Sequence, residues 1–249
     1  MKLLVDIGNS LIHLGVYQEN QKVFYEQLSS NINVDKLLSC MEEVLEPFLL
    51  KIQRCIVSSV KPQFNSVIEL LVEKYCWNYL LVDSVLKTNL KFVLDDAITL
   101  GADLIAAAVG AVSIYPNRNI IIIDMGTATT ISCIKDNSFI GGAILPGLLT
   151  SAEALIEKAA LLKKDPWFLP PEMIAKNTKD CLSVGIIYGH AMAIKGIVET
   201  YQKQLKDSVV IILGGNYFFV KNILQDYQFI NDLIFTGLNI LGTLNEGEE

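Results

Sequence analysis

The chain has 249 residues, of which 51% are hydrophobic and 19% are charged, and its formal net charge is −7. This length suits one large domain or two of roughly 120 residues. The apolar fraction indicates a packed globular protein rather than a disordered chain. The negative charge disfavours binding to nucleic acid through bulk electrostatics.

The cysteines and apolar runs predict where the protein works. Its five cysteines are far apart and form no C-x-x-C pair, which is typical of thiols in a reducing cytosol. The start "MKLLVDIGNS" does not resemble a secretory signal. The longest apolar stretch, "LIAAAVGAVSIY", has 12 residues, too few to span a bilayer. We therefore expect a cytoplasmic protein whose partners include neither nucleic acid nor membrane. With two histidines, His13 and His190, a zinc site is not expected.

The first part of the chain predicts three strands and then alternating helices and strands. Apolar alternation marks the strands, apolar residues at helical spacing mark the helices, and Pro62 opens one of the helices. In chain order we expect strands at 3–6, 11–17 and 22–28, a helix from Val34 to about Phe48, a strand at 54–60, a helix from Pro62 to Tyr75, a strand at 79–83 and a deeply buried helix at 100–115.

The second part repeats this order. We expect strands at 119–126, 129–136 and 138–145, helices at about 148–163 and 182–206, a strand at 208–215, a helix near 217–225 and a last helix from about Gly237. The repetition predicts a duplicated α/β unit with mixed sheets. Pro and Asn interrupt the pattern near Tyr115–Asn119, so the expected halves are residues 1–117 and 118–249.

Each half contains a buried strand that ends in Asp-x-Gly followed by small polar residues. The two copies are "DIGNS", Asp6–Ser10, and "DMGTATT", Asp124–Thr130. Glycine lets the backbone approach a ligand closely. The small residues Asn9, Ser10, Thr127, Ala128 and Thr129 offer donors to phosphate oxygens, and the aspartates suit an accompanying cation. The pair predicts two turns that face each other across a cleft and hold a nucleoside triphosphate.

Two ordinary hairpin turns would give the same local pattern, since Asp-x-Gly is common in turns. The matching positions in both halves favour the phosphate site. A third glycine pair, Gly214–Gly215, ends a strand and begins a helix, where an adenosine could lie against the backbone. The chain has neither G-x-x-x-x-G-K-[ST] nor G-x-G-x-x-G, which argues against P-loop and Rossmann nucleotide sites.

A transfer enzyme also needs a base for the proton of its acceptor. "LGADL" places Asp103 at the start of the apolar helix. A carboxylate is favoured there by the helix dipole alone. A carboxylate entering an apolar helix beside the expected cleft is also a candidate general base.

Together these motifs resemble type III pantothenate kinase, of the acetate and sugar kinase, heat-shock-70 and actin superfamily. The resemblance covers the whole chain. It is carried by "DIGNS" and "DMGTATT", and by "SSVKP" (Ser58–Pro62), "GGAILPGL" (Gly141–Leu148), "SAEAL" (Ser151–Leu155) and "KNT" (Lys176–Thr178). It implies duplicated actin-like, ribonuclease H-like domains with an interdomain nucleotide cleft. It also implies transfer of the ATP γ-phosphate to the 4′-hydroxyl of pantothenate, the first step towards coenzyme A, by a homodimer.

The resemblance also implies a role for each matching residue. The first turn would hold ATP phosphates, with Mg²⁺, through Asp6, Gly8, Asn9 and Ser10. Thr127 of the second turn would contact ATP. Asp124 would bind a monovalent cation, potassium or ammonium, and Asp103 would accept the proton. Pantothenate would contact Gly101, Ala102, Asp103, Leu104 and Thr178.

Two departures from the family pattern affect the acceptor site. "GADL" has Leu104 where the family has arginine, and Leu94 falls where the family usually has a substrate-contacting tyrosine. A lost charge-assisted contact typically costs about 1.5–3 kcal/mol. The absence of the arginine at position 104 predicts weak pantothenate binding, a different acceptor, or compensation by a basic residue such as Lys91 or Lys158. It is also consistent with tolerated variation in an active kinase.

These departures leave two further functions open. One is a weakened, nucleotide-binding regulatory homologue, and the other is a kinase of the same fold that acts on another small alcohol.

Overall fold

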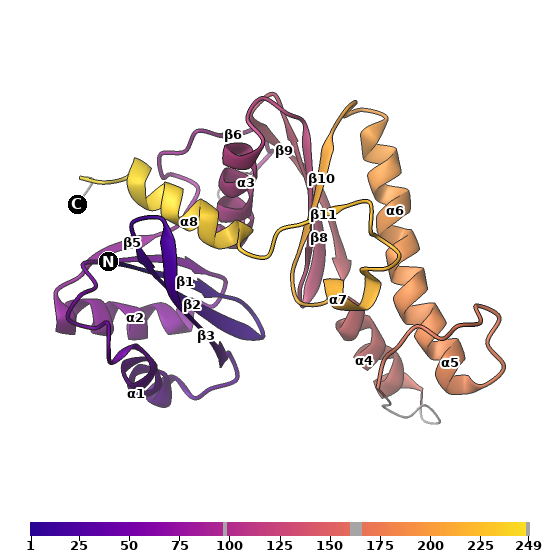
Figure 1. The fold of residues 1–249 in the computed structure, drawn as a ribbon, viewed down its shortest axis with the longest axis horizontal. Helices are drawn as coiled ribbons and strands as arrows, with labels where there is room; N and C mark the ends of the chain where they lie inside the picture. Colours follow the sequence, from indigo (N-terminus) through magenta and orange to yellow (C-terminus); the bar gives the residue numbers. More distant parts are fainter. Residues whose placement is uncertain (97–98, 160–165, 248–249) are drawn as a thin grey trace. The chain divides into compact units, whose positions relative to one another are not determined.

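The computed structural model describes residues 1–96, 99–159 and 166–247. The chain forms two compact α/β units (Figure 1). Unit 1 comprises Met1–Ile114 and Asp232–Glu249, and unit 2 comprises Tyr115–Asn231. The chain therefore leaves unit 1 after its third helix and returns to it for the last one.

Unit 1 is built on a mixed sheet that is covered on both faces, and successive side chains of a strand point to opposite faces. The strands are β1 (Lys2–Ile7), β2 (Leu11–Gln18), β3 (Gln21–Ser29), β4 (Arg54–Ser59) and β5 (Asn78–Leu81), in the order β3-β2-β1-β4-β5. β1 pairs antiparallel with β2 and parallel with β4. Leu3, Val5 and Ile7 enter one hydrophobic cluster and Leu4 enters another, as expected for a strand covered on both faces.

Two pairs of helices supply those covers. Helices α1 (Val34–Leu45) and α2 (Pro62–Tyr75) bury apolar stripes against the face that carries Leu3 and Val5. Helices α3 (Ala102–Ile114) and α8 (Leu233–Leu244) pack on the opposite face, together with Leu4. Figure 1 shows α1 and α2 on one side of the strands and α8 on the other. A short strand, β6 (Lys91–Phe92), precedes α3.

Helices α3 and α8 cross at two glycines. A Cβ atom on Gly237 would lie 1.8 Å from the carbonyl oxygen of Ala106, and one on Gly110 would lie 2.4 Å from that of Leu233. The two backbones are therefore in contact, and neither position accommodates a side chain. This contact explains why the last helix belongs to unit 1.

Unit 2 repeats the strand order of unit 1. Its strands are β7 (Ile120–Met125), β8 (Ala128–Lys135), β9 (Ser138–Pro146), β10 (Val209–Leu213) and β11 (Gln228–Phe229), in the order β11-β10-β7-β8-β9. β7 pairs antiparallel with β8 and parallel with β10, just as β1 pairs with β2 and β4. The predicted duplication and mixed sheets are therefore confirmed.

A long helical run covers one face of the second sheet. It is continuous through α5 (Thr178–Ser183), the π-helical turn η1 (Val184–Tyr188) and α6 (Gly189–Gln202), and the shorter helices of the unit are α4 (Leu148–Lys158) and α7 (Tyr217–Val220). By length and composition alone this run of 25 residues could cross a membrane. Its buried row, Ile187, Ala191, Ile194 and Val198, packs instead with Ile121 and Ile123 of β7. The run is thus a core helix of unit 2.

The predicted elements differ from the structure mainly at their ends. The helix expected at 182–206 begins at Thr178, and the last helix begins at Leu233 rather than Gly237. Helix α4 ends at Lys158, and the expected end at 163 lies outside the described residues. The short strands β6 and β11 were not predicted. The expected second half, 118–249, differs from unit 2 because the last helix packs on α3.

Replacing Gly237 with alanine tests the contact between α3 and α8. Alanine favours an isolated helix by about 1 kcal/mol over glycine, but here the added methyl would overlap the backbone of Ala106. We expect Gly237→Ala to lower the free energy of unfolding by about 1–3 kcal/mol or more, measured by chemical denaturation. The matched control is Gly196→Ala in α6, where an added Cβ meets nothing within 4 Å. That control should leave stability unchanged or raise it, and equal losses in both variants would contradict the packing argument.

Candidate functional site

The first Asp-x-Gly turn follows the end of β1 and is held by backbone bonds. Gly8 N donates to Leu11 O at 2.9 Å, Ser30 N donates to Ser10 O at 3.0 Å, and the Ser30 hydroxyl donates to Gly8 O at 2.8 Å. The side chains of Asn9 and Ser10 are exposed. The turn is therefore fixed from behind by β2 and Ser30, while its small polar residues remain accessible.

Asp6 lies on the face of the sheet that α3 and α8 cover. The residue is 9% exposed, and its register partners on the neighbouring strands are His13 on β2 and Ser58 on β4. His13 Nδ1 is hydrogen-bonded to the Tyr25 hydroxyl at 2.8 Å, and burial lowers the pKa of His13, so its ring is neutral near pH 7. His13 thus has a structural partner, as expected for a lone histidine on a strand.

Lys61 is a cation beside this turn to which the sequence motifs assigned no role. Its Nζ donates to Ser30 O at 3.0 Å, and Ser30 is the residue that closes the turn through Gly8 and Ser10. Lys61 belongs to the "SSVKP" segment, whose Val60 N donates to Ile7 O at 3.0 Å. Lys61 is the one charged residue of this segment, and that was the signal that could have identified it.

The second turn, after β7, is also closed by a bond from its glycine N–H to a carbonyl at the start of the next strand, but it spans one residue fewer than the first turn. Gly126 N donates to Ala128 O, two residues later, at 3.0 Å, whereas Gly8 N donates to Leu11 O, three residues later. Thr127 O accepts from Gly147 N at 3.0 Å and from the Thr150 hydroxyl at 2.6 Å. The Thr127 side chain is exposed. The start of α4 therefore holds the backbone of this turn and leaves the threonine accessible.

The predicted adenosine segment packs directly on the second turn. Gly214 has φ +92°, and a Cβ there would lie 2.6 Å from the backbone of Met125. Asn216 N donates to Met125 O at 3.1 Å, and its side-chain Nδ2 donates to Gly126 O at 2.9 Å. Only glycine fits the Gly214 position, because its φ and its close contact both exclude a side chain. The segment thus fixes the turn that follows Asp124.

Thr129 does not present its hydroxyl at the surface, contrary to the expectation for this motif. The residue is fully buried, and its Oγ1 is hydrogen-bonded to His190 Nε2 of α6 at 2.9 Å. Burial lowers the pKa of His190, which keeps the imidazole neutral near pH 7. Thr129 therefore anchors β8 to α6, while Thr127 is the accessible threonine of the turn.

Asp103 lies in the first turn of α3, in unit 1 with Asp6. Burial raises the pKa of Asp103 above its usual range, and a backbone hydrogen bond from Leu104 N to its Oδ1, at 2.8 Å, opposes the rise. A Cβ on Gly101 would lie 2.5 Å from that same oxygen. Because Gly101 has no side chain, the Asp103 carboxylate fits beside the backbone. Its partial burial there increases its proton affinity.

The other predicted substrate residues are divided between the units. Gly101, Ala102 and Leu104 flank Asp103 in unit 1, and Leu104 and Leu94 are half-buried. Thr178 is exposed at the start of α5 in unit 2, where the preceding Asn177 caps the helix by accepting from Asp180 N at 2.9 Å.

The two basic residues considered as substitutes for the family arginine are both accessible. Lys91 is exposed in β6. Lys158 ends α4 with a side chain 82% exposed, and its Nζ lies 3.8 Å from Glu157 Oε1. Exposed pairs of this kind contribute little to stability, so this pair leaves Lys158 able to bind another anion.

Asp124 is flanked in the sheet by one hydroxyl-bearing residue and one apolar residue. Its register partners are Thr130 on β8 and Leu213 on β10. Within the described ranges, no group of three or more His, Cys, Asp or Glu side chains is arranged to hold a metal ion. A cation at Asp124 would thus be one that a single carboxylate binds together with ligand oxygens, the mode usual for hard cations beside phosphates.

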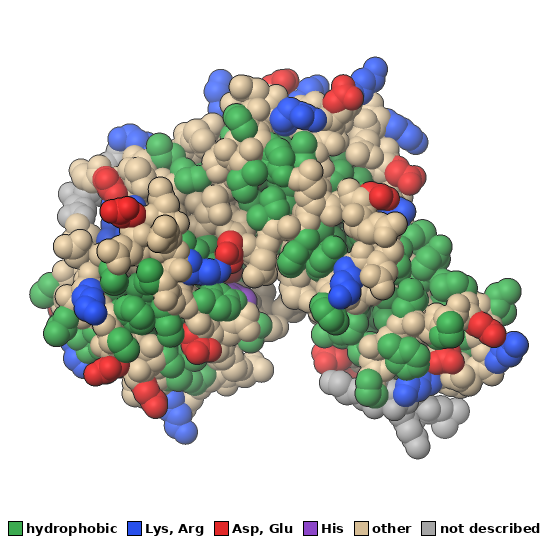
Figure 2. Space-filling model, in the orientation of Figure 1, with side chains coloured by type: hydrophobic (Ala, Val, Ile, Leu, Met, Phe, Trp, Pro, Cys, Tyr) green, Lys and Arg blue, Asp and Glu red, His purple; other side chains and the backbone are tan. Residues whose placement is uncertain are grey.

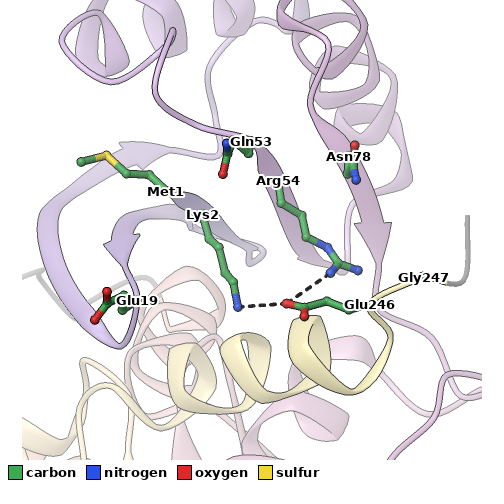
Figure 3. Close-up of a pocket in the computed structure, with 8 residues that line it drawn as sticks. All are labelled: Met1, Lys2, Glu19, Gln53, Arg54, Asn78, Glu246 and Gly247. Atoms are coloured by element: carbon green, nitrogen blue, oxygen red, sulfur yellow. Dashed lines mark ion pairs between the residues drawn. The ribbon is translucent and has the colours of Figure 1, made fainter.

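A pocket of about 560 Å³ lies at the opposite ends of β1 and β4 in unit 1 (Figure 3). Glu246, just beyond α8, approaches Lys2 Nζ at 3.6 Å and Arg54 Nη1 at 3.7 Å. Arg54 Nη2 also donates to Asn245 O at 2.9 Å. These contacts attach the end of α8 to the first residues of two strands. The pocket contains none of the predicted site residues.

Known proteins match this chain over nearly its whole length. A model of the type III pantothenate kinase family matches residues 2–200. Type III pantothenate kinase 1 of Francisella tularensis subsp. holarctica (strain OSU18) is 34% identical over 266 residues, which cover 99% of this chain and 100% of the relative. Type III pantothenate kinase of Elusimicrobium minutum is 35% identical over 254 residues, with 96% and 97% covered.

Solved structures show the fold alone, because their identities are low. A Campylobacter jejuni protein assigned to the Baf family of transcriptional activators has a TM-score of 0.65 at 22% identity, and 98% of each chain is covered. Component A of (R)-2-hydroxyglutaryl-CoA dehydratase from Acidaminococcus fermentans has a TM-score of 0.59 at 13% identity, with 100% and 99% covered. The fold is thus the actin-like α/β fold, and the family match over most of its length shows that this chain belongs to the type III pantothenate kinase family.

Proposed function

We propose that this protein transfers the γ-phosphate of ATP to the 4′-hydroxyl of pantothenate, the first step of coenzyme A biosynthesis. The observation that carries the proposal is the pair of matching Asp-x-Gly turns on duplicated sheets, in a chain whose full-length relatives are type III pantothenate kinases. Nothing in these comparisons favours a regulatory role, since the likeness to a Baf family protein extends only to the fold.

The two turns are assigned to the nucleotide. In unit 1, Asp6, Gly8, Asn9 and Ser10 would hold ATP phosphates together with Mg²⁺. In unit 2, Thr127 would contact ATP. Accessible small side chains on rigid backbone turns support this assignment, because phosphate oxygens are bound by donors that need no rearrangement. That both turns act on a single triphosphate is part of the proposal.

Asp124 is assigned to a monovalent cation, potassium or ammonium. The residues present fit such an ion: Asp124 supplies a carboxylate, and the oxygen of its register partner Thr130 is buried without a hydrogen-bond partner among the described residues. Oxygen ligands suit hard cations. When bound, the ion would supply positive charge near the phosphates. The contribution of the chain is to hold the carboxylate at the end of β7.

Asp103 is assigned as the proton acceptor. Phosphoryl transfer depends mainly on alignment and charge neutralisation, and the base receives the hydroxyl proton as the new O–P bond forms. The proton moves from the 4′-hydroxyl to the Asp103 carboxylate while the bond between the γ-phosphorus and ADP breaks. Burial raises the pKa of Asp103, which makes it a better base than an exposed aspartate.

The acceptor site is assigned to Gly101, Ala102, Asp103, Leu104 and Thr178. Leu104 provides no charge where the family has arginine, so any charged contact to the pantothenate carboxylate would come from another residue. Lys91 and Lys158 are exposed and available for that contact.

The direct test of the proposed function is ADP release with ATP, Mg²⁺ and a potassium salt. We expect release to depend on pantothenate and to fall when potassium is replaced by a large organic cation, because Asp124 then lacks its ion. Other small alcohols serve as acceptor controls. ATP binding without stimulation by pantothenate would contradict the kinase assignment, and stimulation only by another alcohol would replace the acceptor.

Asp103→Asn tests the base. We expect kcat to fall by about 10²–10⁴-fold while ATP binding is retained, measured by steady-state kinetics and calorimetry. In the wild type, kcat/KM should fall as pH drops through the raised pKa of Asp103, because the base becomes protonated. Because the folded protein disfavours the charged form of Asp103, the contribution of Asp103 to stability should decline as pH rises from the usual carboxyl pKa through the raised pKa. The exposed Asp95→Asn is the control, and full activity of Asp103→Asn would remove Asp103 from this role.

We also propose a homodimer, formed through the apolar surface around α4 and α5. Figure 2 shows hydrophobic side chains gathered on this part of unit 2. Its exposed apolar residues are Leu155, Phe168, Leu169, Met173 and Ile174, and Ile174 is 87% exposed. An exposed apolar patch of this kind is typical of an interface. A cytoplasmic location is part of the same proposal, supported by the five free cysteines.

Measuring the oligomeric state tests the proposed interface at this surface. We expect sedimentation to give twice the chain mass of 27.6 kDa, and Ile174→Glu to shift the protein to one chain because a charge would be buried at the interface. Leu50→Glu, at a residue 93% exposed in unit 1, is the matched control and should leave the mass unchanged. A wild-type protein of one chain mass would exclude the dimer.

A further inference from the structure

Each of the two aspartates has a buried hydroxyl beside it that lacks a hydrogen-bond partner. Ser58 is the register partner of Asp6 on β4, and Thr130 is the register partner of Asp124 on β8. Among the described residues, Ser58 Oγ and Thr130 Oγ1 are both buried without a hydrogen bond. Ser58 as a whole is 0% exposed. Register partners on neighbouring strands point to the same face, so each hydroxyl is next to a carboxylate.

An unpaired buried hydroxyl opposes folding, because it has lost its bonds to water. Alanine at position 58 or valine at position 130 would fill similar space without that cost. The same arrangement occurs in both units, at the one strand position of each that carries a site aspartate. A hydroxyl at such a position would contribute to ligand binding if it formed its hydrogen bond only after the neighbouring carboxylate had changed its position or its charge environment.

We propose that Ser58 and Thr130 are positioning residues, whose hydroxyls donate to Asp6 and Asp124 when these carboxylates engage the nucleotide and its cations. The proposal rests on the proposed function. A carboxylate that gives one oxygen to a cation leaves the other free to accept a hydrogen bond, and such a bond fixes its orientation. Ser58 acts from β4 and Thr130 from β8, so neither hydroxyl needs to contact the substrate.

The proposal predicts that one substitution, Ser58→Ala, affects the stability of the ligand-free protein and its affinity for nucleotide in different ways. Ser58→Ala should leave the melting temperature of the ligand-free protein unchanged or raised, because an unsatisfied hydroxyl is removed. The same variant should weaken binding of a non-hydrolysable ATP analogue with Mg²⁺ by about 10- to 100-fold, measured by calorimetry, while KM for pantothenate changes much less. Ser58→Thr, which keeps the hydroxyl, should retain more of the affinity than Ser58→Ala.

Thr130→Val should weaken binding of the monovalent cation rather than binding of the nucleotide. We expect the potassium concentration that half-maximally raises the melting temperature of the nucleotide-bound protein to increase by about 10- to 100-fold, and Thr130→Ser to restore it.

Matched controls come from the same strands. Ser59→Ala removes the next hydroxyl on β4, which accepts from Lys61 N at 3.3 Å and points to the other face. Ser132→Ala removes a buried hydroxyl two residues along β8, opposite Ile122 rather than a carboxylate. Both controls should bind nucleotide and potassium as the wild type does.

The proposal is wrong if Ser58→Ala and Thr130→Val bind their ligands within about twofold of the wild type. It is also wrong if their melting temperatures fall in step with ligand affinity, since both hydroxyls would then be structural. Failure of the proposed function has a different signature: the wild type would release no ADP in response to pantothenate, whereas the binding comparisons would still decide the roles of Ser58 and Thr130.

Discussion

A carboxylate near the end of a strand whose preceding three residues are apolar is the constraint on which the rest of this structure depends. Both Asp6 and Asp124 lie one residue before the last residue of a central strand, and both strands pair on two sides. Placing a charge there opposes burial, so the chain must turn at once and give the carboxylate a polar edge. Glycine at positions 8 and 126 provides that turn in both units.

The packing around the turns keeps them rigid while leaving their small side chains accessible. In unit 1, Ser30 bonds to both Gly8 and Ser10. In unit 2, Gly147 and Gly214 bring two further segments against the turn, and a side chain at either position would collide with backbone. Rigid donors suit phosphate recognition because little rearrangement is needed on binding. The glycines that allow this packing are far apart in sequence, so no local motif contains them all.

The duplicated sheets differ in what covers them, and the chemistry proposed for the two units differs accordingly. In unit 1, the face that carries Asp6 is covered by α3, which brings Asp103 to the same layer of the molecule. In unit 2, α6 covers the face opposite to Asp124 and holds Thr129 through His190. One unit therefore combines a proposed phosphate-binding turn with the proposed base, and the other combines a proposed phosphate-binding turn with the proposed cation residue.

The sequence by itself determined the order of strands and helices, the duplication, the two turns and the family, because apolar periodicity and Asp-x-Gly are local patterns. It did not determine the burial of Thr129, the place of Lys61 next to Ser30, or the hydroxyls of Ser58 and Thr130 beside the two aspartates. Those depend on strand register and on which helix covers which face. The return of the last helix to unit 1 likewise depends on Gly237 meeting Ala106, a contact between residues far apart in the chain. Only tertiary packing decides such contacts, because it brings distant backbones within van der Waals distance.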